Sequence, residues 1–375
     1  MSSTEKPERD LKQEEEDSAV SPELLDGATP QTPILSPEVT SARSLAADTG
    51  SPLKRRLEAF EDVLDSDVGD TNLSRARNLE REMGLRQVYL KFDGGNPTGT
   101  QKDRIAFAQA MDALRRGFDA VTVATCGNYG AAMALAASVA GLRCIVYIPA
   151  GSHTGRLTEM EGYGAEIVRA EGGYEEAVRA SQERAARDEI YDANPGGDNT
   201  SIQFRAYAEI ASEIYDDLRD APAAVAAPVS NGTTLVGIYR GFVSLYRRGK
   251  ISRIPKMIAG SSPIKNPIVE SYLKGAARCE DLDPRQVRET KINEALVNWH
   301  SIDGDPALQA IRESGGFAES VPDKTLTAWA RTLRQMEGLS ALPAATAGLA
   351  AFAQRHRQET FGPDRYVIVL TGRRT

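Results

Sequence analysis

The sequence predicts an α/β fold built on a doubly wound, mostly parallel sheet. Short apolar runs alternate with stretches of helical length along most of the chain, and such alternation is typical of parallel strands joined by crossover helices. Several of these runs end in a polar, glycine-containing turn that opens the next helix. The length of 375 residues suggests two domains or one large α/β unit.

The alternation is clearest in the first half of the folded part. Residues 88–92 are expected to form a strand, followed by the polar loop Gly94–Gly99. A helix is then expected from about Asp103 to Arg116, with Gly117 ending it. The elements expected after it are strands at 120–124, 144–149 and 165–168 and helices at 130–139, 154–163 and 174–186.

The second half repeats the alternation less regularly. Strands are expected at 223–229 and 255–259, and a final buried strand at 366–370. The chain has no repeat of fixed period.

Residues 1–50 differ in composition from the rest of the chain. They contain the acidic run Glu14–Glu16 and many Ser, Thr and Pro residues, with little aliphatic periodicity. Such a segment cannot bury enough apolar surface to offset the entropy of ordering. We expect a disordered acidic leader, which is either a plain solvated tail or a regulatory, partner-binding segment. The folded part is expected to begin near Ser51.

The bulk charge excludes several function classes. A formal net charge of -8 and a pI of about 5.2 do not suit nucleic-acid binding. The sequence has no apolar run of membrane-spanning length and no apolar core of a signal peptide near its start. The cysteines Cys126, Cys144 and Cys279 are widely spaced, and no metal-binding motif is present. We expect a cytoplasmic protein without a metal site or a membrane partner.

Lys102 lies where a polar Gly-Pro loop meets the start of a helix, in the segment Asn96–Arg104. A lysine that forms a Schiff base must be reachable and must be able to lose its proton. A helix N-terminus favours the neutral amine because its partial positive charge opposes the ammonium. On its own, a lysine at a helix start is more often a solvated surface residue.

Two further turns follow strands and open helices. Thr125–Gly130 places an amide side chain between two glycines, which lets a flat ligand or a carboxylate approach the backbone. Ser230–Gly237 offers hydroxyl groups and free N–H groups at a helix N-terminus, as a phosphate cradle does. No lysine of the nucleotide-binding P-loop type follows this second turn. Each turn alone is equally compatible with an ordinary capped helix start.

Together these segments resemble the tryptophan-synthase-like, fold type II group of pyridoxal phosphate enzymes, and most of all the threonine synthase branch. The resemblance covers residues 69–372, and its landmarks occur in the order found in the family. They are Gly69–Leu73, Asn96–Arg104, the Gly127-Asn128 turn, the loop at 230–234, Ser314–Gly316, Glu337–Ala345 and Leu370–Gly372.

The resemblance implies a fold, a cofactor and roles for individual residues. It implies two doubly wound α/β domains with pyridoxal 5'-phosphate in the cleft between them. It also implies a homodimer. The large cofactor-binding domain would comprise 51–92 and 191–375, and the smaller movable domain 93–190. The implied cofactor residues are Lys102 as the Schiff-base lysine, Asn128 at the cofactor's 3-oxygen, Ser230, Asn231, Gly232, Thr233 and Thr234 around the phosphate, and Thr371 at the pyridine nitrogen.

A hydroxyl such as that of Thr371 does not force protonation of a pyridine nitrogen as a carboxylate would. The electron sink is then suited to elimination and replacement rather than to transamination. The residues expected on the substrate side are Thr98, Thr100, Gln101, Thr125, Cys126, Gly127, Tyr129 and Arg205.

The substrate side is also where the chain departs from the threonine synthase pattern. The family usually has Thr-Pro where this chain has Thr71-Asn72, and Ser-Phe-Lys where it has Thr100-Gln101-Lys102. It often has Ser-Ser-Gly-Asn where this chain has Thr125–Asn128. Cys126 is thereby either a plain replacement of serine or a redox-sensitive thiol. The family's Asn-Ser-x-Asn-Pro-x-Arg is here Tyr191–Gly197, which lacks the arginine. Arg205, further along the chain, is the candidate that could take its place. Gly304-Asp305-Pro306 likewise stands for Gly-Asn-Pro.

These differences leave the substrate open, because contacts to the reacting side chain decide specificity. The expected reaction replaces the phosphate, or a similar leaving group, of an amino acid. It yields either threonine from phosphohomoserine and water or cysteate from phosphoserine and sulfite. Deamination by a threonine or serine dehydratase-like enzyme is a third outcome. A non-catalytic cofactor-binding protein is the alternative from another class, and the presence of Lys102, Asn128 and Thr371 argues against it.

Overall fold

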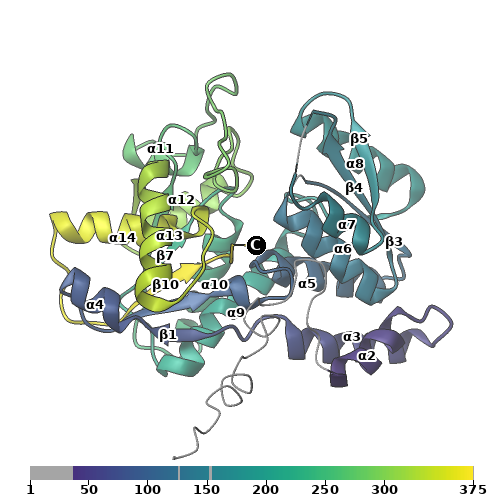
Figure 1. Cartoon of the computed structure of the whole chain (residues 1–375), viewed down its shortest axis with the longest axis horizontal. Helices are drawn as coiled ribbons and strands as arrows, with labels where there is room; N and C mark the ends of the chain where they lie inside the picture. The colour runs from purple at the N-terminus through teal and green to yellow at the C-terminus, as the bar shows by residue number, and fades with distance from the viewer. Residues whose placement is uncertain (1–36, 126, 152–153, 375) are drawn as a thin grey trace, which may run out of the picture. The chain divides into compact units, whose positions relative to one another are not determined.

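The computed structural model describes residues 37–125, 127–151 and 154–374 (Figure 1). The strands are β1 (Leu73–Arg75), β2 (Val88–Phe92), β3 (Ala120–Ala124), β4 (Arg143–Pro149), β5 (Glu166–Ala170), β6 (Tyr191–Asp192), β7 (Ala224–Pro228), β8 (Lys256–Ser261), β9 (Phe317–Ser320) and β10 (Tyr366–Leu370). The α-helices are α2 (Pro37–Ala47), α3 (Leu53–Asp67), α4 (Arg77–Met83), α5 (Lys102–Arg115), α6 (Asn128–Ala140), α7 (Leu157–Gly162), α8 (Tyr174–Asp188), α9 (Thr200–Leu218), α10 (Thr233–Arg247), α11 (Pro267–Leu273), α12 (Gly304–Glu313), α13 (Asp323–Glu337) and α14 (Ala347–Gln358).

The strands of the described residues form two sheets. The six-stranded sheet has the order β1-β2-β10-β7-β8-β9, and every neighbouring pair in it is parallel except β1 and β2. The four-stranded sheet has the order β5-β4-β3-β6 and is wholly parallel. The predicted α/β class with doubly wound parallel sheets is confirmed.

Alternate residues of the central strands feed two different cores. In β7, Val225 and Ala227 pack into the core that contains α9 and α10, whereas Ala224 and Ala226 pack into the core that contains α13 and α14. Successive side chains of a strand point to opposite faces. A strand that is covered by helices on both faces therefore becomes a continuous apolar run rather than an alternating one. Such a run is the pattern of residues 224–228.

Close packing on the six-stranded sheet depends on two glycines. A Cβ at Gly260 would lie 2.0 Å from the backbone oxygen of Ala347, and a Cβ at Gly348 would lie 2.6 Å from the backbone nitrogen of Ala227. These distances are far shorter than any van der Waals contact, so only glycine allows α14 to approach β7 and β8 this closely. Figure 1 shows α14 and α13 on the sheet that contains β7 and β10.

The expectation of a disordered leader is wrong for residues 37–47, which form α2. Val39 and Ala46 of this helix are buried in the main core, and Ala42 and Leu45 pack against it. These residues are spaced three and four apart and so share one helical face. The short apolar face was too sparse to stand out among the Ser, Thr and Pro residues. Residues 1–36 of the expected leader lie outside the described residues.

The strand predictions agree closely with the structure. Residues 88–92, 120–124 and 366–370 form strands with the predicted bounds. The short strand β6 pairs with β3, which puts Tyr191 and Asp192 in the four-stranded sheet and not with the larger domain as expected. None of the helices in the described part of the chain is long and apolar enough to cross a membrane.

Candidate active site

The carboxyl ends of three neighbouring strands meet at one edge of the six-stranded sheet. The strands β2, β10 and β7 are adjacent and parallel. After β2 comes the loop that leads to Lys102, after β10 comes Thr371, and after β7 comes the turn that opens α10. In such sheets the ligand lies outside the carboxyl ends of the strands. The three predicted cofactor segments therefore lie together although they are far apart in sequence.

Lys102 is the first residue of α5, and its side chain is only partly accessible. Burial lowers the pKa of its amine to about 8, although the negative charge of Asp303 opposes this shift. The amine lies 5.7 Å from the centre of the Tyr129 ring and has no hydrogen-bond partner within the described residues. A considerable fraction of Lys102 is then neutral near physiological pH, as a nucleophile or general base requires.

The loop before Lys102 is held from two sides. Asp103 is fully buried and accepts hydrogen bonds from the backbone N–H and the hydroxyl of Thr98, both at 2.9 Å. Burial raises the pKa of Asp103 to about 7. The backbone N–H of Gln101 donates to the carbonyl of Thr371 at 2.9 Å, which ties the loop to the end of β10. Thr98 therefore shapes the loop with its hydroxyl.

A buried ion cluster lies directly behind this loop. Arg104 is 4% exposed and binds Asp93 at 2.8 Å and Glu213 at 2.5 Å. The amine of Lys91 pairs with Glu213 and also donates to the carbonyl of Thr71. Two cations thus face two carboxylates in a region with little solvent, so each charge has a partner. The cluster connects β2, α5 and α9 and fixes the start of the helix that carries Lys102.

Asn128 begins α6 at the carboxyl end of β3. Its Oδ1 accepts a hydrogen bond from Nε of Arg156 at 3.1 Å. Because a guanidinium only donates, the amide oxygen of Asn128 must face Arg156, and Nδ2 is left to donate elsewhere. Arg156 also donates to the carbonyl of Thr98 at 3.0 Å and to Glu159 at 2.5 Å. This arginine therefore joins the asparagine turn to the lysine loop.

The turn after β7 has the features of an anion cradle. Gly232 precedes α10 with a φ of +95°, and a Cβ there would lie 2.8 Å from the carbonyl oxygen of Asp303. No side chain of the described residues caps the start of α10, so its first N–H groups face outward without a side-chain acceptor. The loop at 298–303 braces the turn: Asn298 donates to the side chain of Asn231, and Ser301 to the carbonyl of Ser230.

Asp303 is an acidic residue at this cradle that sequence reasoning missed. It is 6% exposed, and its Oδ2 accepts a hydrogen bond from the hydroxyl of Thr233 at 2.6 Å. Its backbone N–H donates to the carbonyl of Asn231 at 3.0 Å. In the sequence, an aspartate before Gly304 at a helix start indicates only an N-cap. Arg156 was missed as well, because a single arginine in a polar loop has no characteristic spacing.

The hydroxyl of Thr371 lies at the end of β10, the strand between β2 and β7. Thr371 is 8% exposed, and its hydroxyl has no hydrogen-bond partner within the part of the chain that the structure describes. A hydroxyl without a protein partner at the centre of the strand ends is available to a ligand.

Most of the remaining predicted substrate residues lie close to Lys102 and Asn128. Thr100, Gln101, Thr125 and Gly127 lie in the same turns as Lys102 and Asn128. Tyr129 contributes its ring, whereas its hydroxyl donates to the carbonyl of Ala193 at 2.7 Å and accepts from Gln109. Cys126 lies outside the described residues.

Arg205 is not brought to these turns. It follows the buried Phe204 on α9 and is itself exposed to solvent. It has no hydrogen bond or ion pair with a described site residue. The physical reason is helical periodicity. The apolar side of α9 faces the core, so the polar position 205 points outward. The basic group that lies at the site is Arg156 instead.

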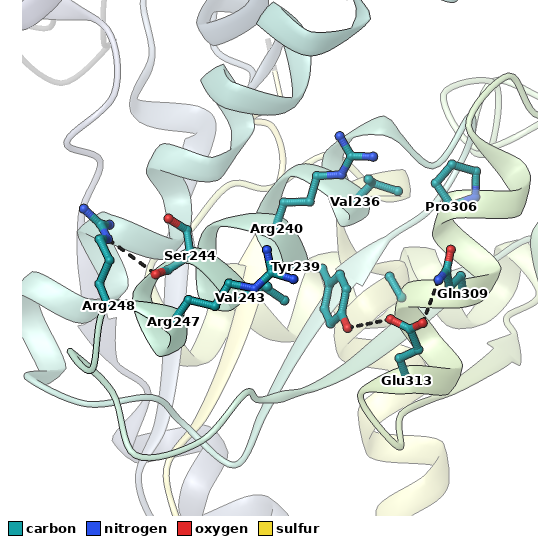
Figure 2. A pocket seen from close by; sticks show the side chains of 11 residues that line it. Val236, Tyr239, Arg240, Val243, Ser244, Arg247, Arg248, Pro306, Gln309 and Glu313 are labelled. Atoms are coloured by element: carbon teal, nitrogen blue, oxygen red, sulfur yellow. Dashed lines mark hydrogen bonds between the residues drawn. The ribbon is translucent and has the colours of Figure 1, made fainter.

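A separate surface pocket of about 550 Å³ lies between α10 and α12 (Figure 2). Glu313 accepts hydrogen bonds there from Tyr239 at 3.0 Å and from Gln309 at 2.6 Å. None of the predicted site residues lines it. Arg240 of this pocket is relevant to the site only through its charge: burial raises the pKa of Asp303, and the positive charge of Arg240 partly opposes that rise.

Comparison with known proteins agrees with this arrangement. The family model described as pyridoxal-phosphate dependent enzyme matches residues 64–372. The chain belongs to the pyridoxal-phosphate-dependent enzymes. It therefore uses pyridoxal phosphate, and the resemblance inferred from the motifs is confirmed.

Relatives within this pyridoxal-phosphate-dependent family include threonine synthases. The chain is 31% identical to threonine synthase of Methanocaldococcus jannaschii over 305 residues, which cover 81% of this chain and 74% of that protein. It is 32% identical to threonine synthase of Synechocystis over 314 residues, 81% and 76% of the two chains.

Solved structures with the same fold include maize serine racemase, with a TM-score of 0.71 at 15% identity, covering 85% of this chain and 92% of that one. Threonine deaminase isoform 2 of Solanum lycopersicum gives a TM-score of 0.69 at 17% identity and covers 92% of each chain. At these identities the likeness establishes the fold and not the substrate.

Proposed function

We propose that this enzyme replaces the phosphate of an O-phosphorylated amino acid and forms threonine from phosphohomoserine and water. The observation that carries the proposal is the sheet order β2-β10-β7. It puts the hydroxyl of Thr371 between the strand that leads to Lys102 and the strand that leads to the phosphate cradle. A cofactor with an aldehyde, a ring nitrogen and a phosphate needs these three partners in one place. The threonine synthases among its relatives favour this substrate over the others.

The residues present fit the cofactor. Lys102 would hold its aldehyde, Asn128 would donate to its 3-oxygen, the turn at 230–234 would hold its phosphate, and the Thr371 hydroxyl would meet its ring nitrogen. The orientation of the Asn128 amide supports this assignment, because Arg156 engages Oδ1 and leaves Nδ2 as a donor. The uncapped start of α10 supports the phosphate assignment. When bound, pyridoxal phosphate stabilises negative charge at the Cα of an amino acid.

Lys102 is the group that moves protons in this proposal. Once released by the incoming substrate amine, it takes the Cα proton and later returns it. Its lowered pKa of about 8 keeps enough of the amine neutral for the first of these steps. The phosphate group then leaves, and a water molecule supplies the hydroxyl group of the product. The overall balance is phosphohomoserine plus water giving threonine plus inorganic phosphate.

Phosphate release tests the substrate. The holoenzyme is incubated with phosphohomoserine, or with phosphoserine in the presence and absence of sulfite. Inorganic phosphate and amino-acid products are then measured. We expect phosphate and threonine in equal amounts from phosphohomoserine alone. Phosphate release that requires both phosphoserine and sulfite would replace this function with cysteate synthesis. Formation of a keto acid from threonine or serine would indicate a deaminase.

Arg156 provides a test of the Asn128 assignment. We expect Arg156→Met to weaken pyridoxal phosphate binding about tenfold or more, the equivalent of one lost charge-assisted hydrogen bond. Arg156→Lys should not restore it, because a lysine cannot reach Asn128, Thr98 and Glu159 at once. Absorbance titration of the cofactor-free variants measures the affinity. Arg143→Met, which removes an exposed arginine of β4, is the matched control. Wild-type affinity in Arg156→Met would contradict this role.

The homodimer remains a prediction from the family resemblance, and the cytoplasmic location remains a prediction from the sequence alone. Light scattering of the purified protein would test the first, and fractionation of cells the second.

A further inference from the structure

Asp303 occupies an unusual place for an acidic side chain. It is the N-cap residue of α12, yet its carboxylate makes no capping hydrogen bond to that helix. It turns instead to the hydroxyl of Thr233, the first residue of α10. A cap on α12 would be the ordinary structural role of an aspartate at this position, and the geometry excludes that role. The carboxylate thus occupies the hydroxyl of Thr233, a hydrogen-bond donor of the cradle that the cofactor's phosphate would need.

A carboxylate and a phosphate dianion at the same cradle repel each other. The hydrogen bond of 2.6 Å fixes one Asp303 oxygen at the hydroxyl of Thr233. The backbone bond from Asp303 to Asn231 keeps the residue there, and Gly232 packs against its carbonyl. Because the residue is held by its own backbone and is almost fully buried, withdrawal into solvent is not open to it. The repulsion is relieved if one proton is shared between the two acids.

We propose that Asp303 binds the phosphate of pyridoxal phosphate as a neutral carboxylic acid, so that this enzyme takes up a proton when it binds its cofactor. The inference rests on the cradle assigned under the proposed function, and it deepens that assignment. It makes Asp303 a residue that sets the affinity for the cofactor. A carboxylic acid donates a short hydrogen bond to a phosphate oxygen, whereas a carboxylate cannot donate at all.

The electrostatic surroundings are consistent with a proton at this position. Burial raises the pKa of Asp303 even though the hydrogen bond from Thr233 and the positive charges of Arg240 of α10 and Lys102 of α5 oppose the shift. A bound phosphate dianion adds a negative charge and raises the pKa of Asp303 further. Because the bound state holds the extra proton, affinity for a phosphorylated ligand must fall as pH rises above the pKa of Asp303 in the free protein.

Other titratable groups near this segment are engaged elsewhere. Asp305 accepts from the backbone N–H of Cys279 at 2.7 Å, and His300 pairs with Asp281 at 2.8 Å. Burial raises the pKa of the Cys279 thiol to about 11, so it stays neutral. Asp305→Asn therefore removes the same charge from the same helix start without touching the cradle, and it is the matched control for Asp303→Asn.

Calorimetry with pyridoxine 5'-phosphate tests the proposal. This probe carries the phosphate but no aldehyde, so the Schiff base with Lys102 does not contribute. Titrations near pH 8 in two buffers with different heats of ionisation give the protons taken up on binding. We expect the wild type and Asp305→Asn to take up about one proton more than Asp303→Asn. Because the charge of Asp303 raises the pKa of Lys102, proton uptake by Lys102 need not be equal in the three proteins. The same titrations are therefore repeated with Lys102→Ala added to each protein, which removes that contribution.

The affinities give a second readout. Between about pH 7 and pH 8 we expect the wild-type affinity for the probe to fall roughly tenfold more than that of Asp303→Asn, which corresponds to one linked proton. Equal proton uptake and equal pH slopes in the wild type and Asp303→Asn would overturn the proposal. That outcome leaves the proposed function intact as long as the probe binds. Failure of the wild type to bind the probe or pyridoxal phosphate at all would instead overturn the cradle itself.

Discussion

Lys102→Ala is expected to lower phosphate release from phosphohomoserine by roughly a thousandfold, the effect of losing a general base that is also the covalent anchor of the cofactor. The yellow colour of the bound cofactor should also shift or disappear, because the other described lysine near this edge, Lys91 of β2, is fully buried and paired with Glu213. Stopped assays of phosphate and absorbance spectra of the purified proteins measure the two effects.

The control for this variant is Lys274→Ala, which removes an exposed lysine just after α11. It should keep the activity and the spectrum of the wild type. Far-ultraviolet circular dichroism should be the same for all three proteins, since Lys102 makes no hydrogen bond with its side chain among the described residues. Substantial turnover by a folded Lys102→Ala protein would contradict the role assigned to this residue.

The pKa of Lys102 adds a dependence on pH. Burial lowers this pKa to about 8, and only the neutral amine attacks the aldehyde of the cofactor. The rate at which cofactor-free enzyme captures pyridoxal phosphate should therefore rise as pH increases through about 8 and then level off. A lysine in water would show the same rise only near its ordinary pKa of about 10.4.

Arg104→Ala is expected to cause the largest loss of stability, about 3–5 kcal/mol in the free energy of unfolding. The change leaves Asp93 and Glu213 buried with only Lys91 to balance them. Unpaired buried charge is costly because the interior cannot solvate it. Urea unfolding of the cofactor-free protein, followed by circular dichroism, measures the effect.

Lys54→Ala is the surface counterpart of this variant. Its pair with Glu58 is 88% and 60% exposed on α3, and its loss should cost less than about 1 kcal/mol. An Arg104→Ala protein as stable as Lys54→Ala would mean that the buried cluster adds nothing to the free energy of unfolding.

The same cluster predicts how stability changes in acid. Burial raises the pKa of Glu213, but hydrogen bonds and charge from Arg104, together with the charge of Lys91, outweigh it and lower the pKa to about 2. Since the pKa is depressed in the folded state, the stabilisation is complete above the ordinary carboxyl pKa and is lost as pH falls towards about 2. Glu213→Gln should flatten this part of the stability curve.

The fold and the cofactor segments were predictable because each depends on local sequence. Strands such as 120–124 are short apolar runs flanked by turns, and their length distinguishes them from helices. Lys102, Asn128 and the turn at 230–234 each follow a strand end, where a parallel sheet collects its ligand contacts. The order of these motifs along the chain then identified the family.

Contacts between distant segments were not predictable in the same way. Arg156 is linked to Asn128 only because α7 folds back beside the start of α6, and nothing in the spacing of the two residues announces it. Nothing in the sequence around Asp303 indicates its contact with Thr233, which depends on how the loop at 298–303 lies against α10. The helix at 37–47 was missed because tertiary burial of a few residues outweighs a polar composition.

The most direct test of the central claim is the position of the lysine that carries the cofactor. The holoenzyme is reduced with borohydride, digested with a protease and analysed by mass spectrometry. Reduction fixes the cofactor to the lysine that held it. We predict a single modified peptide, with pyridoxyl phosphate on Lys102. A label on any other lysine, or unlabelled protein that nevertheless turns over substrate, would contradict the account.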